Sequence, residues 1–253
     1  MRIYTSLCFL LFFFFASAQS EPALIKDWKS YPLLSVIEND LLKNRYRPFL
    51  FRQNDQIAVM DQKTKISQVF PFEFYWASTA DQMTMSGMKT FMKVNNGYLV
   101  GFNNGEFGGG LYWFSSDGTS RYRISNHYVN QFIWRKDTLL AIHGIVSRNI
   151  DEGTLLSLSF DNEGWHAREL LNFPYAPFAI DLDRKGNLIV ASRSGLMSVK
   201  RLTKISNIEV SEWLSNGYPT SLIIQNDVAY VGMTGGVFNF DLRTRKSSWL
   251  LPR

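Results

Sequence analysis

The chain has 253 residues, of which 45% are hydrophobic, 19% charged and 15% aromatic. This composition is sufficient to bury a large core, so it excludes an intrinsically disordered protein. The formal net charge of +5 arises from charges that are scattered along the sequence. It therefore does not indicate a nucleic-acid-binding protein.

Residues 1–18 have the pattern of a secretory signal peptide. Arg2 precedes an apolar run at 7–15, and small residues then lead to a cleavage site between Ala18 and Gln19. The alternative is a membrane anchor, which needs an apolar run of about 20 residues, roughly twice the length of this one. We therefore expect a periplasmic or secreted protein with no membrane span after the leader is removed.

The only cysteine, Cys8, lies inside this leader. The mature chain is therefore expected to contain no thiol, which excludes disulfides, zinc–thiolate sites, iron–sulfur clusters and cysteine nucleophiles. No cofactor is predicted, although a divalent cation stays possible.

The remainder of the sequence has an all-β pattern, with short apolar or alternating runs separated by Gly, Asn and Asp. Similar segments recur about 40 to 50 residues apart, a spacing typical of propeller blades. They are residues 97–101, 138–142, 187–191 and 228–232. The sequence therefore predicts a single β-propeller of four-stranded blades at 31–253, with five blades favoured and six possible.

Strand boundaries are clearest in the last two units, where strands are named A to D from the axis outward. The fourth unit is predicted as A 178–183, B 188–192, C 196–201 and D 208–214. The last unit is predicted as A 221–225, B 228–233, C 237–241 and D 247–251.

The first unit is ambiguous. The turn after Asp61 resembles the turn after Asp241, which predicts that 57–61 is a C strand and 49–52 a B strand. Strand A would then lie near 33–37. In the competing interpretation, 33–42 is an amphipathic helix.

A propeller needs a strand that joins its two ends, because an unpaired sheet edge recruits other chains. The N-terminal segment 19–30, and within it 23–29, is placed to act as this closing strand. The last strand at 247–251 is expected to be structural, so that its truncation destabilises the ring.

Residues 186–199 and 227–241 resemble the repeats of two-component-regulator and NHL-type propellers, which include secreted bacterial proteins. Asp241, Thr244 and Trp249 are similar to the tryptophan-docking repeat of quinoprotein-like propellers, but Arg245 stands where that pattern has glycine. A gluconolactonase-like propeller is a further comparison, and its set of metal ligands cannot be assigned here. These resemblances imply architecture and not chemistry, because such folds host many functions.

The loops from B to C and from D to A surround one mouth of a propeller, so their polar residues are candidate ligand contacts. The longest B–C loop carries Asn104 and Glu106, and corresponding loops carry Arg148 and Arg193. Glu106 could bind a metal, transfer a proton or accept a hydrogen bond, and the two arginines could grip an anion. The alternative is a solvated glutamate within an ion-pair network.

Tyrosines precede the predicted A strands at Tyr128, Tyr175 and Tyr218. They could form an aromatic ring around the mouth that suits sugars or protein side chains. The alternative is that each packs between blades, because a recurring position in a repeat usually serves packing.

His127 and His143 are predicted to approach one another near the mouth, where Glu106 would complete a minimal metal or acid–base set. No histidine pair has a recognisable ligand spacing, so neither a metal site nor a catalytic residue is assigned.

The sequence favours a secreted or periplasmic binding module, expected to be monomeric, that recognises an envelope or extracellular protein or a glycan through one loop-rich face. It would have no catalysis of its own and would not bind nucleic acid. The alternative is a metal-assisted lactonase, hydrolase or lyase that uses Glu106 with His127 or His143.

Overall fold

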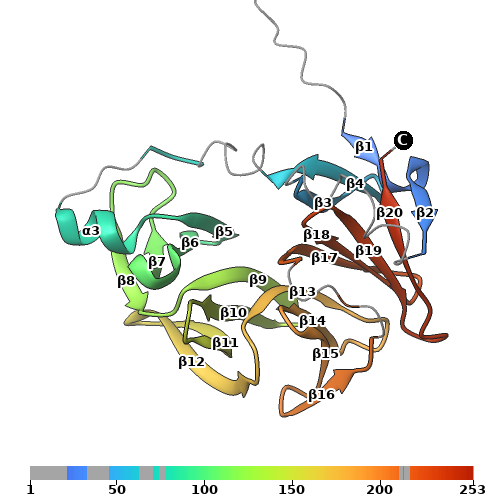
Figure 1. The fold of residues 1–253 in the computed structure, drawn as a ribbon. Coiled ribbons are helices and arrows are strands. Elements are labelled where there is room, and N and C mark those ends of the chain that lie inside the picture. The colour runs from blue at the N-terminus through green and yellow to red at the C-terminus, as the bar shows by residue number, and fades with distance from the viewer. Residues whose placement is uncertain are drawn as a thin grey trace, which may run out of the picture.

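The computed structural model describes residues 22–32, 46–62, 71–73, 78–210, 213 and 217–252. Five β-sheets surround a central axis and form a five-bladed β-propeller, which confirms the predicted fold class (Figure 1). The predicted signal peptide at 1–18 and the ambiguous segment at 33–42 lie outside the described residues. Within the described part of the chain, no helix is long and apolar enough to cross a membrane.

Blades 2, 3 and 4 are antiparallel four-stranded sheets whose strands follow one another in sequence. Blade 2 contains β5 (Met88–Val94), β6 (Gly97–Asn103), β7 (Gly109–Phe114) and β8 (Arg121–Ser125). Blade 3 contains β9 (Val129–Arg135), β10 (Thr138–Val146), β11 (Asp151–Asp161) and β12 (Gly164–Phe173). Blade 4 contains β13 (Pro177–Leu182), β14 (Leu188–Ser192), β15 (Gly195–Lys200) and β16 (Lys204–Ile208).

Blades 1 and 5 each include a strand from the N-terminal segment. Blade 5 contains β17 (Pro219–Gln225), β18 (Val228–Met233), β19 (Gly236–Asp241) and β20 (Ser247–Leu251), and its fifth strand is β2 (Lys29–Tyr31). Blade 1 contains β3 (Pro48–Gln53), β4 (Gln56–Asp61) and β1 (Ala23–Leu24), in the order β1-β4-β3. Between β1 and β2 lies the short 3-10 helix η1 (Ile25–Asp27).

The predicted order of the strands within blade 1 is wrong, because each of the two strands lies one place nearer to the axis than predicted. β3 contacts β17, the innermost strand of blade 5, and the backbone N–H of Leu50 donates to Ser221 Oγ at 2.8 Å. Residues 49–52 therefore belong to strand A and residues 57–61 to strand B, rather than to B and C. The turn after Asp61 misled the prediction because similar turn residues serve every hairpin of a propeller.

The predicted D strand of blade 4, 208–214, is also wrong, since β16 occupies Lys204–Ile208. The chain reverses directly after β15, where Arg201 and Leu202 both have positive φ (53° and 61°). Val210 and Trp213 lie beyond the strand and pack against the core shared by blades 4 and 5. Their apolar spacing reflects this packing rather than strand pairing.

The core lies mainly between consecutive blades, because each sheet buries one face on the next. One cluster joins Leu140 and Ile142 of blade 3 to Val190 of blade 4. Another joins Ala191 of blade 4 to Trp249 of blade 5. Alternate burial along the strands therefore fixes both the register within a blade and the stacking of blades.

The ring closes between blades 5 and 1 through the N-terminal segment and the inner strands. Ala23 pairs with Val59 of β4, and Lys29 pairs with Leu251 of β20. Beneath this segment Ile25, Trp28, Leu50, Ile57, Val59, Ile223, Val237 and Leu250 form one buried cluster. Residues 23–31, which we call the clasp, thus pair with both the first and the last blade.

Trp249 is the most informative core residue to remove. It is fully buried in β20, while Trp134 on β9 has 47% of its surface exposed. Truncating a large buried aromatic side chain to alanine typically costs about 3–5 kcal/mol. We expect Trp249→Ala to lower the free energy of unfolding by that amount and Trp134→Ala by under about 1 kcal/mol. Urea unfolding measures both, and equal effects would contradict this account of the core.

Arg245, which stands where the tryptophan-docking pattern has glycine, lies in the turn between β19 and β20. Asp241 Oδ1 accepts hydrogen bonds from the backbone N–H groups of Arg243 and Thr244, both at 2.8 Å, and these bonds lower the pKa of Asp241. Arg245 has a φ of 63°, in the left-handed region that only glycine occupies without strain.

We expect Arg245→Gly to be neutral or stabilising by up to about 1 kcal/mol, because relief of strain outweighs the added freedom of the unfolded chain. Arg245→Val, in which a β-branched side chain occupies the same conformation, should be destabilising. Thermal unfolding of the two variants gives the comparison, and a stabilising valine would refute the strain argument.

Candidate functional site

A hollow of about 320 Å³ lies at the end of the axis where the five inner strands begin. Each blade contributes a residue within one position of the start of its inner strand. These residues are Arg47, Met88, Asn130, Phe178 and Pro219 for blades 1 to 5. We call this space the axial hollow.

Two asparagines fix one wall of the axial hollow. Asn103 Nδ2 donates to Asn130 Oδ1 at 2.6 Å and to the carbonyl oxygen of Gly144 at 2.9 Å. Asn130 Nδ2 in turn donates to the carbonyl of Pro177 at 2.7 Å, and Asn103 Oδ1 accepts from the N–H of Gly105 at 2.9 Å. The pair therefore links blades 2, 3 and 4, and each amide oxygen keeps one further lone pair for a ligand hydroxyl.

Aromatic side chains form the wall of the axial hollow contributed by blades 4 and 5. The rings of Phe178 and Tyr218 meet edge to face at 5.7 Å, and both residues line the hollow. The guanidinium carbon of Arg193 lies 5.7 Å from the centre of the Tyr218 ring, a cation–π arrangement. The structure thus brings together two of the predicted contact residues, Arg193 and Tyr218.

Arg47 and Gln62 line the side of the hollow nearest to blade 1. Gln62 is 8% exposed, its N–H donates to the carbonyl of Arg47 at 2.7 Å, and its Nε2 approaches Met88 Sδ at 3.8 Å. Its Oε1 is buried and has no hydrogen-bond partner within the described part of the chain. Arg47 is exposed and uses Nε for a long bond of 3.4 Å to Thr234 Oγ1.

A second hollow, of about 520 Å³, lies beside the axial hollow at the rim of blades 2 and 3. Its walls are the B–C loops of these blades, which include the 3-10 helix η2 (Gly105–Phe107). It is lined by Asn104, Gly105, Glu106, Phe107, Val146, Ser147 and Arg148. Because Gly105 and Val146 also line the axial hollow, the two spaces adjoin along one wall. The predicted residues Asn104, Glu106 and Arg148 therefore gather in this rim pocket.

Tyr128 and Tyr175 have other positions. The ring of Tyr128 packs so closely against Gly109 that a Cβ added there would lie 2.3 Å from its Cδ1, and its N–H donates to His143 Nδ1 at 2.9 Å. These contacts are those of a tyrosine that packs between blades 2 and 3. Tyr175 is 38% exposed and lines neither hollow.

The rings of His127 and His143 lie 5.2 Å apart, as predicted, but the carboxylate beside them belongs to a different residue. His127 Nε2 is 3.1 Å from Glu169 Oε1 on the outermost strand of blade 3. Among the residues that the structure describes, which include Glu106, no three histidine or acidic side chains are placed to hold a metal ion. The predicted set of Glu106 with these histidines is therefore not assembled.

Sequence reasoning missed most of the axial hollow. Asn130 lies within an A strand, outside the loops from which contact residues were predicted, and Asn103 is the last residue of a B strand, directly before the predicted contact residue Asn104. The alternation of β9 was the available signal, because it places Asn130 on the face of the strand opposite Val129, which is buried between blades.

No protein-family model and no curated protein matches the sequence. Among solved structures the chain is similar to the extracellular domains of two hybrid two-component systems of B. thetaiotaomicron, BT4673 and BT3049. For BT4673 the identity is 16% and the TM-score 0.41, covering 63% of this chain and 20% of that one. For BT3049 the identity is 13% and the TM-score 0.42, covering 83% and 24%.

The extracellular domain of BT4673, described also as a one-component system, matches a second time with 11% identity and a TM-score of 0.32, covering 81% of this chain and 38% of that one. The chain therefore spans well under half the length of each of these structures. Likeness at this level establishes no family, so the resemblance to NHL-type and two-component-regulator repeats stays a prediction.

His143 should make stability depend on pH. Burial, followed by the charge of His127, lowers the pKa of His143 from 6.5 to about 4. The folded protein therefore binds fewer protons than the unfolded chain between these values. The contribution of His143 to the free energy of unfolding is complete above pH 6.5, and it falls by about 3 kcal/mol as the pH drops towards 4.

We expect His143→Gln to flatten this part of the curve of unfolding free energy against pH, because an amide oxygen can still accept the Tyr128 N–H but does not titrate. The control is His166→Gln, since His166 is an exposed histidine that pairs with Asp161 at 2.9 Å. Urea unfolding between pH 7 and 4 makes the comparison, and equal slopes for the two variants would show that His143 is not responsible.

Proposed function

We propose that the protein is a secreted or periplasmic binding propeller that recognises a glycan along the groove formed by the axial hollow and the rim pocket. The proposal rests on one observation: the axial hollow and the rim pocket share Gly105 and Val146 in their walls, so the two spaces adjoin each other. Such a groove suits an extended chain, with one end at the axis and the other between blades 2 and 3.

The chemistry of the lining favours a ligand rich in hydroxyl groups. The locked oxygens of Asn103 and Asn130 supply acceptors, and Arg47 supplies donors. Phe178 and Tyr218 offer flat apolar surfaces for the C–H face of a sugar ring. Because the asparagines are already held by hydrogen bonds within the chain, little side-chain entropy is lost when a ligand binds.

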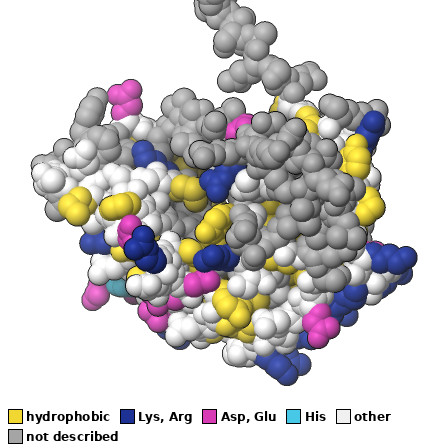
Figure 2. Space-filling model, viewed as in Figure 1, with side chains coloured by type: hydrophobic (Ala, Val, Ile, Leu, Met, Phe, Trp, Pro, Cys, Tyr) yellow, Lys and Arg dark blue, Asp and Glu magenta, His cyan; other side chains and the backbone are white. Residues whose placement is uncertain are grey.

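The proposed compartment rests on the leader at residues 1–18. The distribution of charge adds a further argument. On the coloured part of the face in Figure 2, basic and acidic side chains both occur, and the basic ones do not gather into one large patch. That pattern does not favour nucleic acid as a partner.

Exposed apolar side chains on the same rim favour a protein as the second candidate ligand. Phe107 is 67% exposed and Met83, in the helix α3 (Thr79–Thr84), is 58% exposed. The two lie near each other, because a Cβ added at Gly108 would be 2.7 Å from the carbonyl oxygen of Met83. A protein partner would bury both, whereas a sugar in the groove would leave Met83 in water.

We expect Tyr218→Ala to weaken glycan binding roughly tenfold by removing an aromatic surface of the axial hollow. Tyr175→Ala is the matched control, since Tyr175 precedes a strand in the same way but lines neither hollow. A glycan array followed by calorimetry with the tightest oligosaccharide gives the affinities. Equal losses in the two variants would contradict the proposed site.

Substitutions in the rim pocket test the proposed glycan site separately. Glu106→Gln and Arg148→Gln should reduce the affinity for longer oligosaccharides and leave that for a single sugar unchanged. If no glycan binds, but a protein partner does and Phe107→Ser abolishes its binding, the second candidate replaces the first.

A further inference from the structure

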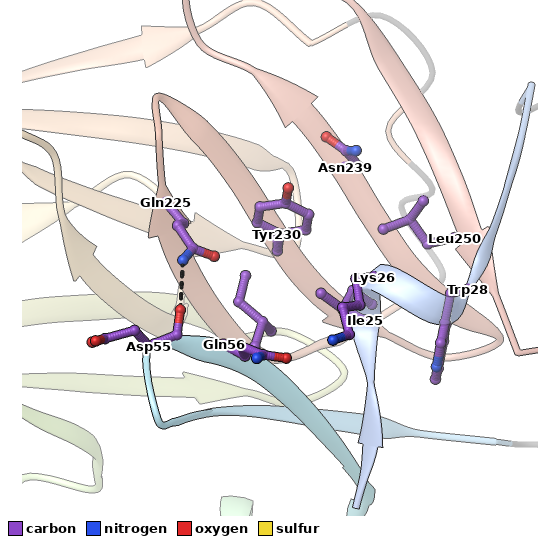
Figure 3. A pocket seen from close by; sticks show the side chains of 10 residues that line it. Ile25, Lys26, Trp28, Asp55, Gln56, Gln225, Tyr230, Asn239 and Leu250 are labelled. Carbon is purple, nitrogen blue, oxygen red and sulfur yellow. Dashed lines mark hydrogen bonds between the residues drawn. The ribbon is translucent and has the colours of Figure 1, made fainter.

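A separate pocket of about 340 Å³ lies where the clasp crosses the junction between blades 1 and 5 (Figure 3). The clasp contributes Ile25, Lys26 and Trp28 to its walls, while Asp55 lies in the turn after β3 and Gln225 is the last residue of β17. The axial hollow lies at the beginnings of these same two strands. The two sites are therefore at opposite ends of the ring, and we call the second one the clasp pocket.

The floor of the clasp pocket is apolar. Trp28 and Leu250 are each 8% exposed and Ile57 is 2% exposed, and all three belong to the cluster that closes the ring. Tyr230, which is partly buried, packs against this cluster. An aliphatic or aromatic body of a ligand would thus meet an aliphatic and aromatic surface.

The polar groups of the pocket carry one uncompensated charge. The ammonium of Lys26 is exposed and makes no hydrogen bond or ion pair within the described residues. The only acidic residue of the lining, Asp55, uses its backbone oxygen to accept from Gln225 Nε2 at 3.0 Å. In Figure 3 its carboxylate points away from the other labelled side chains. The charge presented to a ligand is therefore positive.

Neutral donors lie around the same space. Tyr230 and Asn239 are partners across β18 and β19, and Figure 3 shows the Tyr230 hydroxyl directed towards the Asn239 amide. Burial raises the pKa of Tyr230, so its hydroxyl keeps its proton and can donate. Gln56 adds a second amide to the lining.

We propose that the clasp pocket binds a small organic acid, with a carboxylate held by Lys26 and an apolar body of about one or two rings seated on Trp28 and Ile57. A volume of about 340 Å³ is at the small end of the range for ligand pockets, which suits such a molecule rather than a polymer chain. Because the clasp forms one wall, the bound acid stabilises the closed ring.

The test uses phenylacetate and indole-3-acetate, with phenylacetamide and indole-3-acetamide as uncharged partners of the same shape. The acids are expected to raise the melting temperature of the full mature chain, and their affinity by calorimetry should exceed that of the amides about tenfold or more. Equal binding of acids and amides, or no binding of any probe up to about 10 mM, would overturn the proposal.

Matched variants locate the site. Lys26→Gln should weaken binding of the acids about tenfold or more, because a charge-assisted hydrogen bond is lost. Lys29→Gln removes the same charge from an exposed position on the same segment that does not line the pocket, so it should have no effect. Equal effects of the two variants would mean that the acids respond only to net charge.

A third variant and an independent readout guard against a folding defect. Tyr230→Phe keeps the floor of the pocket and should reduce affinity only a few-fold. Bound acid should also slow limited proteolysis of the clasp in the wild-type chain and in Lys29→Gln but not in Lys26→Gln. Unchanged cleavage at saturating acid in all three would refute the placement of the ligand beneath the clasp.

Discussion

Closure of the ring between blades 1 and 5 is the constraint on which the other features depend. Each blade buries one face on the next, so the first and last blades are stable only if they meet. Leu50 and Ser221 join their inner strands at 2.8 Å, and the Arg52 guanidinium reaches Asp181 of blade 4 at 2.6 Å. The axial hollow exists only in the closed ring, because Arg47 and Thr220 come from opposite ends of the sequence.

Local patterns were sufficient for blade 5 and for the three inner strands of blade 4, and insufficient for the outer strand of blade 4 and for blade 1. At Asn226 and Asp227 both φ values are positive (52° and 64°), so the residue types that specify a tight hairpin turn marked the boundary correctly. The turn after Asp61 carries similar residues, but these residue types do not determine which hairpin of a blade the turn belongs to. That choice is made by the contact of β3 with β17, which joins positions over 150 residues apart.

The candidate site was predictable where it lies in loops and hidden where it lies in strands. Asn104, Glu106 and Arg148 were found because B–C loops meet at one mouth in any propeller, and they line one pocket. The partner of His127 could not be inferred from the sequence. His127 lies in the loop between β8 and β9, and Glu169 reaches it from the long outer strand β12, more than 40 residues further along the chain. Gln62 gave no signal at all, because its burial arises from the approach of blade 2 through Met88.

The groove and the clasp pocket are connected by the two strands that close the ring. β3 begins directly after Arg47 at the axial hollow and leads into the turn that holds Asp55 at the clasp pocket, and β17 runs from Pro219 to Gln225 between the same two sites. A ligand at either end gains its contacts only when these strands lie side by side. Both ligands would therefore favour the same closed arrangement, and the effect of one on the affinity of the other must be reciprocal. The strength of this coupling depends on how often the junction of blades 1 and 5 opens in the unliganded protein. If the junction is always closed, neither ligand can shift the equilibrium between open and closed forms, and the two affinities are independent.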